Sequence, residues 1–193
     1  MITNGRLDGV RHVPAADMGG YLVRPRWLLI HYTGGSGAVG AIGQLTTRDD
    51  TYVSAHLLLA PDGEVTQLVP FGRQAYHAGQ SRWMEVSRLN AYTIGLELVN
   101  PGYMRPGSPR SWPTIRAAHQ LVGGPYREWY VYPEEQLASA AAVCAKLLNH
   151  YTSIEGILGH DDVAHPRGRK LDPGPAFQMV AFRERVKALG VVG

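Results

Sequence analysis

The stretch Trp27-Leu28-Leu29-Ile30-His31-Tyr32, closed by Thr33-Gly34-Gly35, decides the fold. Its apolar residues follow one another without interruption, whereas a strand with one solvated face alternates apolar and polar residues. The run therefore predicts a strand that is buried on both faces of a sheet. The glycines after it mark a turn. His31 is thus expected near the carboxyl end of a buried strand.

Further strands and helices are predicted along the chain. Pro61-Asp62-Gly63 predicts a tight turn that joins two β-rich runs into a hairpin, because proline presets φ and glycine supplies a positive φ. Pro133 suits a first helical turn, and Glu134 and Glu135 after it complement the helix dipole. Strands interleaved with helices predict an α/β fold with a central mixed β-sheet flanked by helices. The expected strands are 52–60, 64–69, 93–99 and 154–158, and the expected helices are 37–47, 133–151 and 175–189.

The length of 193 residues suits one domain. We expect a single domain over residues 1–193, with a core from about 22 to 190. Residues 100–133 are rich in proline, glycine and aromatic residues, and they predict a loop insertion. This insertion either extends a sugar-binding groove or folds over a hydrophobic cluster of its own.

The composition excludes several classes of protein. Apolar residues make up 45% of the chain and charged residues 18%, which is typical of a globular protein. The net charge of +3 is too small for a dedicated duplex-binding domain, so no nucleic-acid partner is expected. The single cysteine, Cys144, excludes an intrachain disulfide and a cysteine-rich zinc module. Nothing in the sequence indicates an oligomeric state.

The first residues and the hydropathy pattern bear on location. Residues 1–14 carry Arg6, Asp8, Arg11 and His12 and lack the apolar core of a secretory signal. No window approaches the roughly 18 apolar residues of a membrane span. We therefore expect no membrane span and a protein that is cytoplasmic as synthesised.

Metal-capable side chains lie at the ends of predicted strands, beside glycine-rich turns. His31 lies near the end of the first strand, His160 follows Gly159 after the strand 154–158, and Asp172 comes twelve residues later. Two imidazoles and one carboxylate, with a position left for water, form the ligand set of a catalytic zinc site. Zinc would lower the pKa of its bound water to about 7, which makes hydroxide available at neutral pH.

Each of these residues also has a structural interpretation. His31 is compatible with a hydrogen-bonded core histidine, and His160 with a turn that is capped by the aspartate after it. Asp172 before a proline is a good turn former. The spacing alone favours these structural roles over zinc.

Six blocks of sequence change that balance. In order they are HYT at 31–33, SAHLLL with PDGEV between 54 and 65, AYHAG at 75–79, IGLEL at 94–98, GHDD at 159–162 and KLDPGPAF at 170–177. Together they resemble the zinc-dependent N-acetylmuramoyl-L-alanine amidases, whose superfamily includes the peptidoglycan recognition proteins. The resemblance covers about residues 27–178, most of the chain, and implies the mixed-sheet α/β fold of that superfamily.

The resemblance also implies a role for individual residues. His31, His160 and Asp172 match the three zinc ligands, with an aspartate at the third position as in the branch that includes the cell-wall-recycling amidases. Lys170 matches a lysine that stabilises the oxyanion, and Glu97 matches a carboxylate near the zinc-bound water.

The chemistry of amide hydrolysis agrees with the last two roles. Glu97 can take a proton from water and return it to the leaving amine. Lys170 places a positive charge where the oxyanion develops. Ala55 stands where phage-type members often carry a catalytic tyrosine, so Glu97 is the better candidate for the base. The plain alternatives are a solvated strand residue for Glu97 and an ordinary member of a basic cluster for Lys170.

The other histidines have less to support a role. His165 competes with Asp172 as the third ligand, because the loop after His160 is slightly longer than in recycling-type relatives. Asp172 is preferred, since Lys170 and the Asp-Pro-Gly-Pro run align with it. We expect His77 to line the cleft and bind the substrate. The remaining histidines are assigned to structural or surface positions, namely His12, His56, His119 and His150.

The sequence thus predicts a zinc amidase that hydrolyses the amide bond between N-acetylmuramic acid, or its 1,6-anhydro form, and L-alanine in peptidoglycan or muropeptides. The alternative is a peptidoglycan-binding module without activity. A metallopeptidase acting on protein would more often carry His-Glu-x-x-His, which does not occur here. Two settings stay open, a cytoplasmic recycling enzyme for soluble muropeptides and a phage lysin or exported effector that acts on the polymeric wall.

Overall fold

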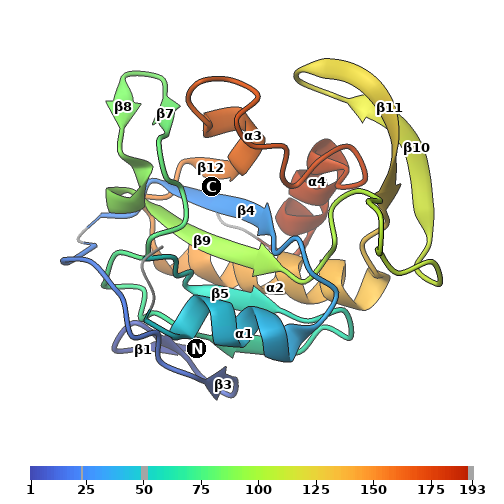
Figure 1. The fold of residues 1–193 in the computed structure, drawn as a ribbon. Coiled ribbons are helices and arrows are strands. Elements are labelled where there is room, and N and C mark those ends of the chain that lie inside the picture. The colour runs from blue at the N-terminus through green and yellow to red at the C-terminus, as the bar shows by residue number, and fades with distance from the viewer. Residues whose placement is uncertain (23, 49–51, 191–193) are drawn as a thin grey trace.

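A six-stranded mixed sheet forms the centre of the protein, in a computed structural model that describes residues 1–22, 24–48 and 52–190 (Figure 1). The strands lie in the order β12 (Gly156–Gly159), β4 (Trp27–Tyr32), β9 (Thr93–Leu98), β5 (Leu57–Leu59), β6 (Val65–Gln67) and β3 (Arg11–His12). Neighbouring strands are parallel except for the antiparallel hairpin of β5 and β6. The predicted α/β fold with a central mixed sheet is confirmed.

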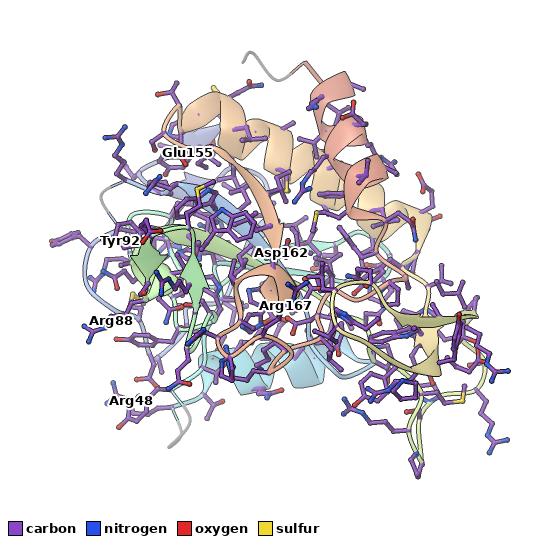
Figure 2. The ribbon with its side chains drawn as sticks, turned by 90° about the horizontal axis from the view of Figure 1, so that it is seen from above. Arg48, Arg88, Tyr92, Glu155, Asp162 and Arg167 are labelled. Carbon is purple, nitrogen blue, oxygen red and sulfur yellow. The ribbon has the colours of Figure 1, made fainter. Side chains whose placement is uncertain are left out.

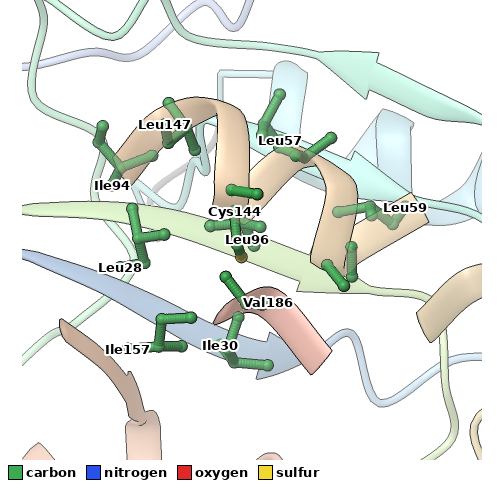
Figure 3. Close-up of a cluster of buried hydrophobic side chains, with 14 of the residues drawn as sticks. Leu28, Ile30, Leu57, Leu59, Ile94, Leu96, Cys144, Leu147, Ile157 and Val186 are labelled. Atoms are coloured by element: carbon green, nitrogen blue, oxygen red, sulfur yellow. The ribbon is translucent and has the colours of Figure 1, made fainter. Parts of the chain in front are cut away.

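Helices cover both faces of this sheet. On one face, α2 (Glu134–His150) and α4 (Met179–Ala188) pack against a large apolar cluster, and on the other lies α1 (Ala38–Thr46). Adjacent residues of a strand point to opposite faces, so a strand between two covered faces is apolar throughout. This explains the uninterrupted run in β4. Figure 3 shows part of the larger cluster, including Leu28, Ile30, Leu96, Cys144, Leu147 and Val186.

Most predicted elements are present, with differences at their ends. The strand at 27–32 is as predicted; the strand predicted at 93–99 ends at Leu98, and the helix predicted at 133–151 is α2. The hairpin is confirmed, but its first strand is reduced to β5, and Ser54 before it donates its N–H to the Tyr76 carbonyl. The last helix begins at Met179 rather than at 175, because the buried Phe177 closes a turn onto the Gly174 carbonyl first.

The segment 100–133 is not the loop that the sequence predicts. It contains an antiparallel hairpin of β10 (Thr114–His119) and β11 (Gly123–Tyr130), which stands apart from the main sheet in Figure 1. The proline and glycine content suggested a loop, yet the prolines lie outside the paired positions or at the exposed end of β11. The Trp129 indole N–H donates to the Ala117 carbonyl at 3.0 Å and ties the two strands together.

The packed domain also extends beyond the core that was expected from about residue 22. The N-terminal strands β1 (Ile2–Thr3) and β2 (Arg6–Leu7) form a small hairpin, and Leu7 is buried in the main cluster. The Gln67 side chain accepts the Leu7 N–H at 2.8 Å. Other short elements are β7 (Arg82–Trp83), β8 (Val86–Ser87), the 3-10 turn Leu89–Ala91 and α3 (His160–Val163). None of the helices within the described ranges is long and apolar enough to cross a bilayer.

The buried His56 gives the fold a testable pH dependence. Its Nδ1 accepts the Gly95 N–H at 3.0 Å, and its Nε2 lies 2.9 Å from the Arg73 carbonyl, so the neutral ring is fully paired. Burial lowers the pKa of His56 to about 4, although the hydrogen bond to Arg73 opposes this shift. Between pH 6.5 and 4 the unfolded chain therefore takes up a proton that the folded chain does not. His56 by itself should lower the free energy of unfolding by about 3 kcal/mol through this window as the pH is lowered.

A variant isolates this contribution. His56→Asn keeps an acceptor near the Nδ1 position and cannot be protonated, so its urea-derived free energy of unfolding should fall less steeply than that of the unmodified protein between pH 6.5 and 4. His31 titrates in both proteins and cancels in the difference. His56 also lowers the pKa of His77, so its removal relieves that shift and changes the slope in the same direction. If the free energy of unfolding changes with pH in the same way in the two proteins, His56 is not held neutral in the folded state.

Candidate active site

Three parallel strands end at one edge of the sheet and carry candidate residues there. His31 is the fifth residue of β4, and Glu97 on β9 is its partner in the parallel register. His160 follows β12 directly as the first residue of α3. Asp172 comes from the loop after α3. Because parallel strands present their carboxyl ends to the same edge, residues far apart in sequence meet at one site.

The helix α3 and the loop after it are each held in place by a hydrogen bond. Asp162 accepts the Gly159 N–H at 2.8 Å and caps α3. Arg167 donates to the Leu121 carbonyl in the turn of the β10–β11 hairpin at 2.9 Å. Figure 2 labels both residues on α3 and its loop in the view from above. The segment that carries Lys170 and Asp172 is therefore braced against the hairpin.

His31, His160 and Asp172 form a compact cluster of ligand atoms. The His31 Nδ1 lies 3.0 Å from the His160 Nδ1 and 3.0 Å from the Asp172 Oδ2, and the last two atoms are 2.9 Å apart. All three side chains are buried. The three predicted ligands are thus brought together, and His165 is not among them. His165 is exposed, and its backbone N–H bonds the Gln80 carbonyl.

The hydrogen bonds around the cluster fit a bound cation. The His160 Nε2 lies 3.1 Å from the Ala78 carbonyl, which can only accept, so the proton of neutral His160 is on Nε2 and its Nδ1 presents a lone pair. This lone pair faces the His31 Nδ1 and a carboxylate oxygen. Three acceptor atoms at this separation repel one another unless a positive charge lies between them. The donor set and its geometry therefore fit a metal ion with two imidazole ligands and one carboxylate ligand.

Burial and charge set the protonation of the cluster. Burial lowers the pKa of His31 to about 4, and His160 acts in the same direction, which favours a neutral imidazole. Burial alone would raise the pKa of Asp172, but the attraction of the His160 and His31 imidazoles, whenever one of them carries a proton toward the carboxylate, outweighs it. The pKa of Asp172 is therefore well below its usual range, and its carboxylate stays ionised. Neutral imidazoles and an ionised carboxylate are the forms that bind metals.

Glu97 lies beside the cluster as a buried carboxyl group. Its Oε1 is 4.0 Å from the His31 Nδ1, and the side chain is only 11% exposed. Burial raises the pKa of Glu97 to about 8; the charge of Asp172 adds to the shift and Lys170 opposes it. Its Oε2 has no hydrogen-bond partner among the described residues. A carboxyl group with a raised pKa and a free oxygen is suited to accept and return protons.

A cleft of about 700 Å³ opens over these residues. Lys170 is exposed and lines it, on the segment that ends in Asp172. Tyr103 and Arg105, from the segment that was predicted to be a loop insertion, line it as well. The Arg105 guanidinium lies 4.2 Å from the centre of the Tyr103 ring, and Arg127 of β11 lies 4.3 Å from it. Apart from the aromatic content of the segment, no pattern in the sequence indicated these individual residues.

His77 is placed differently from the other candidates. It lines the cleft wall but is buried, and both its ring nitrogens lie near protein groups. The Nδ1 is 3.0 Å from the His31 Nε2, and the Nε2 is 3.3 Å from the Thr93 hydroxyl. One ring nitrogen of His77 thus contacts the candidate ligand His31, and its predicted contact with the substrate stays a prediction. His119 is also buried, with its Nε2 3.1 Å from the Leu171 carbonyl, next to Asp172.

Comparison with known proteins gives one matching family. The family model of N-acetylmuramoyl-L-alanine amidases matches residues 22–175. The 1,6-anhydro-N-acetylmuramyl-L-alanine amidase AmpD of Escherichia coli K12 is 34% identical over 132 residues, which are 68% of this chain and 57% of that protein. The matched region thus spans a little over half the length of this relative.

Solved structures give the same likeness. A crystal structure of a selenomethionine derivative of AmpD superposes with a TM-score of 0.72 at 28% identity, over 96% of this chain and 98% of that one. The amidase AmiD from E. coli, in complex with the substrate anhydro-N-acetylmuramic acid-L-Ala-D-γ-Glu-L-Lys, gives a TM-score of 0.67 at 27% identity. This match covers 93% of this chain and 62% of the AmiD chain.

Proposed function

This chain belongs to the N-acetylmuramoyl-L-alanine amidase family, and from that premise we propose that it hydrolyses the amide bond between N-acetylmuramic acid and L-alanine in muropeptides. The observation that carries the proposal is the convergence of two imidazole nitrogens and one carboxylate oxygen within about 3 Å of one another, next to the buried Glu97. The arrangement supplies the groups that amide hydrolysis requires in one cleft.

Zinc is the metal we propose for the site. His31, His160 and Asp172 would hold it, and two nitrogen ligands with one carboxylate are a common set for catalytic zinc. When bound, zinc supplies Lewis-acid polarisation of the scissile carbonyl and lowers the pKa of water at the site. The Asp172 carboxylate offsets one of its two charges.

Glu97 and Lys170 carry the remaining chemistry in this proposal. Glu97 takes a proton from the attacking water and delivers it to the leaving nitrogen of L-alanine, for which its raised pKa is suited. Lys170, exposed at the cleft, places its ammonium group toward the oxygen on which negative charge develops. The segment from Lys170 to Asp172 thus provides an oxyanion stabiliser and a metal ligand two residues apart.

We propose the soluble 1,6-anhydro form as the preferred substrate. The support is the similarity to AmpD, whose name specifies a 1,6-anhydro-N-acetylmuramyl substrate, and to AmiD, which was crystallised with an anhydromuramyl peptide. The cleft is lined by Tyr103 and Arg105, an aromatic ring and a cation that suit a sugar ring and the carboxylates of a stem peptide.

The experiment compares two substrates with and without metal. Purified protein is incubated with a soluble anhydromuramyl tripeptide and, separately, with intact sacculi, and the products are identified by mass spectrometry. We expect release of the free tripeptide from the soluble substrate, loss of this activity after treatment with a chelator, and its recovery with one equivalent of zinc. Binding of the substrate without release of peptide would indicate a binding module instead. Full activity in the chelated protein would contradict the zinc site.

A further inference from the structure

A line of hydrogen bonds leads from the cluster of candidate metal ligands into the interior of the protein. The His31 Nε2 lies 3.0 Å from the His77 Nδ1, the His77 Nε2 lies 3.3 Å from the Thr93 Oγ1, and the Thr93 hydroxyl donates to the Leu89 carbonyl at 2.7 Å. All three side chains in this line are buried. None of them is assigned a part in the reaction above except His31.

The chemistry of each group fixes the direction of the protons. The Leu89 carbonyl can only accept, so the Thr93 hydroxyl donates its one proton to it and presents a lone pair to His77. The His77 Nε2 must therefore carry the proton of its ring, which leaves its Nδ1 as an acceptor. The His31 Nε2 then donates to that acceptor, and the His31 Nδ1 keeps its lone pair free. This Nδ1 is the atom that faces His160 and Asp172.

We propose that His77 is a positioning residue that holds His31 in the tautomer and orientation required to bind the metal. The inference rests on the metal site of the proposed function. It differs from the substrate contact predicted from the sequence, because both nitrogens of His77 are used within the protein. Metal-binding histidines commonly donate their second N–H to such a partner, and removal of the partner typically lowers metal affinity.

The backbone next to His77 serves the second imidazole ligand. The Ala78 carbonyl lies 3.1 Å from the His160 Nε2. The Asn90 side-chain oxygen accepts the N–H groups of both His77 and Ala78, at 3.1 and 2.8 Å, and so fixes this dipeptide. One short segment thus supplies an acceptor to each of the two histidine ligands, from a side chain in one case and from the backbone in the other.

The strand β9 leaves space for the His77 ring. Gly95 of β9 lies directly against it, and a Cβ on this residue would be 2.6 Å from the His77 Cγ and Nδ1. Such a separation is shorter than real carbon contacts. A glycine inside a central buried strand weakens the strand, so its presence at this point is explained by the close approach of the His77 ring.

Two variants of equal shape test the proposal. Asparagine places an amide oxygen close to the position of the His77 Nδ1, whereas leucine has the same branched outline and no acceptor. Zinc affinity is measured by competition with a chromophoric chelator, which does not depend on activity. We expect His77→Leu to bind zinc about 10- to 100-fold more weakly than the unmodified protein, and His77→Asn to stay within roughly threefold of it. Equal affinities in the two variants, whether high or low, would overturn the proposal.

Two further measurements separate positioning from general stability. The Tm of the metal-free variants is compared first, since a merely structural role would lower it without a difference between asparagine and leucine. Thr93→Val then removes the hydroxyl acceptor of the His77 Nε2 proton, while His77 and the backbone of residue 93 stay in place. We expect Thr93→Val to weaken zinc binding in the same direction as His77→Leu but by less, and unchanged affinity would contradict the directed hydrogen-bond line. If the protein binds zinc in this pattern yet cleaves no muropeptide, the proposed function fails and the role of His77 stands.

Discussion

Asp172→Ala should lose both the bound zinc and the amidase activity, whereas His165→Ala should keep both. Asp172 contributes the one carboxylate of the cluster, and its Oδ2 lies 3.0 and 2.9 Å from the two imidazole nitrogens. Two neutral imidazoles that remain after its removal cannot offset the charge of the metal or complete a catalytic site. Activity should fall to the level of the chelator-treated protein. Zinc content is measured by atomic emission and activity by release of the peptide.

His165→Ala is the matched control for this change. His165 lies in the same loop, seven residues before Asp172, but its side chain is exposed and outside the cluster. The variant should contain about one zinc per chain. A metal coordination shell that includes His165 in place of Asp172, at the 2.0–2.1 Å typical of zinc and imidazole nitrogen, would contradict the ligand set. It would also remove the basis for the role of Lys170.

Glu97→Gln should lower kcat by about 10²- to 10⁴-fold, the range typical of general acid–base groups, and leave the zinc content unchanged. Glutamine keeps the shape of the side chain but cannot accept a proton from water. It also removes an ionisable group whose pKa burial raises to about 8. Steady-state kinetics on the soluble anhydromuramyl tripeptide, with zinc analysis of the same samples, gives both quantities.

Glu85→Gln offers a comparison with the same chemical change at a residue that does not line the cleft. Glu85 lies between β7 and β8 with its side chain 93% exposed, so this variant should have unchanged kcat and zinc content. If Glu97→Gln loses zinc, Glu97 is a ligand rather than a base. If it keeps full activity, another group in the cleft transfers the proton.

The sequence allowed the central part of the fold to be predicted, because burial on both faces leaves a clear pattern. The apolar run of β4 and the turn at Pro61-Asp62-Gly63 are local signals of this kind, and both elements are present. The β10–β11 hairpin was missed, since its turn and its proline at 125 resemble loop sequence. Its strands gain stability from tertiary contacts, such as Trp129 packed over Gly174, that no local pattern reveals.

The candidate site could be predicted from the sequence to a similar extent. His31 and His160 stand at strand ends, where parallel topology brings them together, and six sequence blocks supplied the resemblance that selected Asp172 and Glu97 as well. The contacts of His77 could not be predicted from the sequence. It depends on a contact with His31 across 46 positions, and on the absence of a side chain at Gly95.

The pairing of β4 with β12 has a consequence for how the chain reaches its native state. Ile30 pairs with Gly159, and the contacting candidate ligands His31 and Asp172 are 141 positions apart. Such non-local contacts raise the contact order and slow folding. At a synthesis rate of about 5–20 residues per second, roughly 7 to 28 seconds separate the two ligands on the ribosome. Until β12 has been synthesised, β4 lacks its partner on one side, and its unpaired apolar edge is open to pairing with other chains.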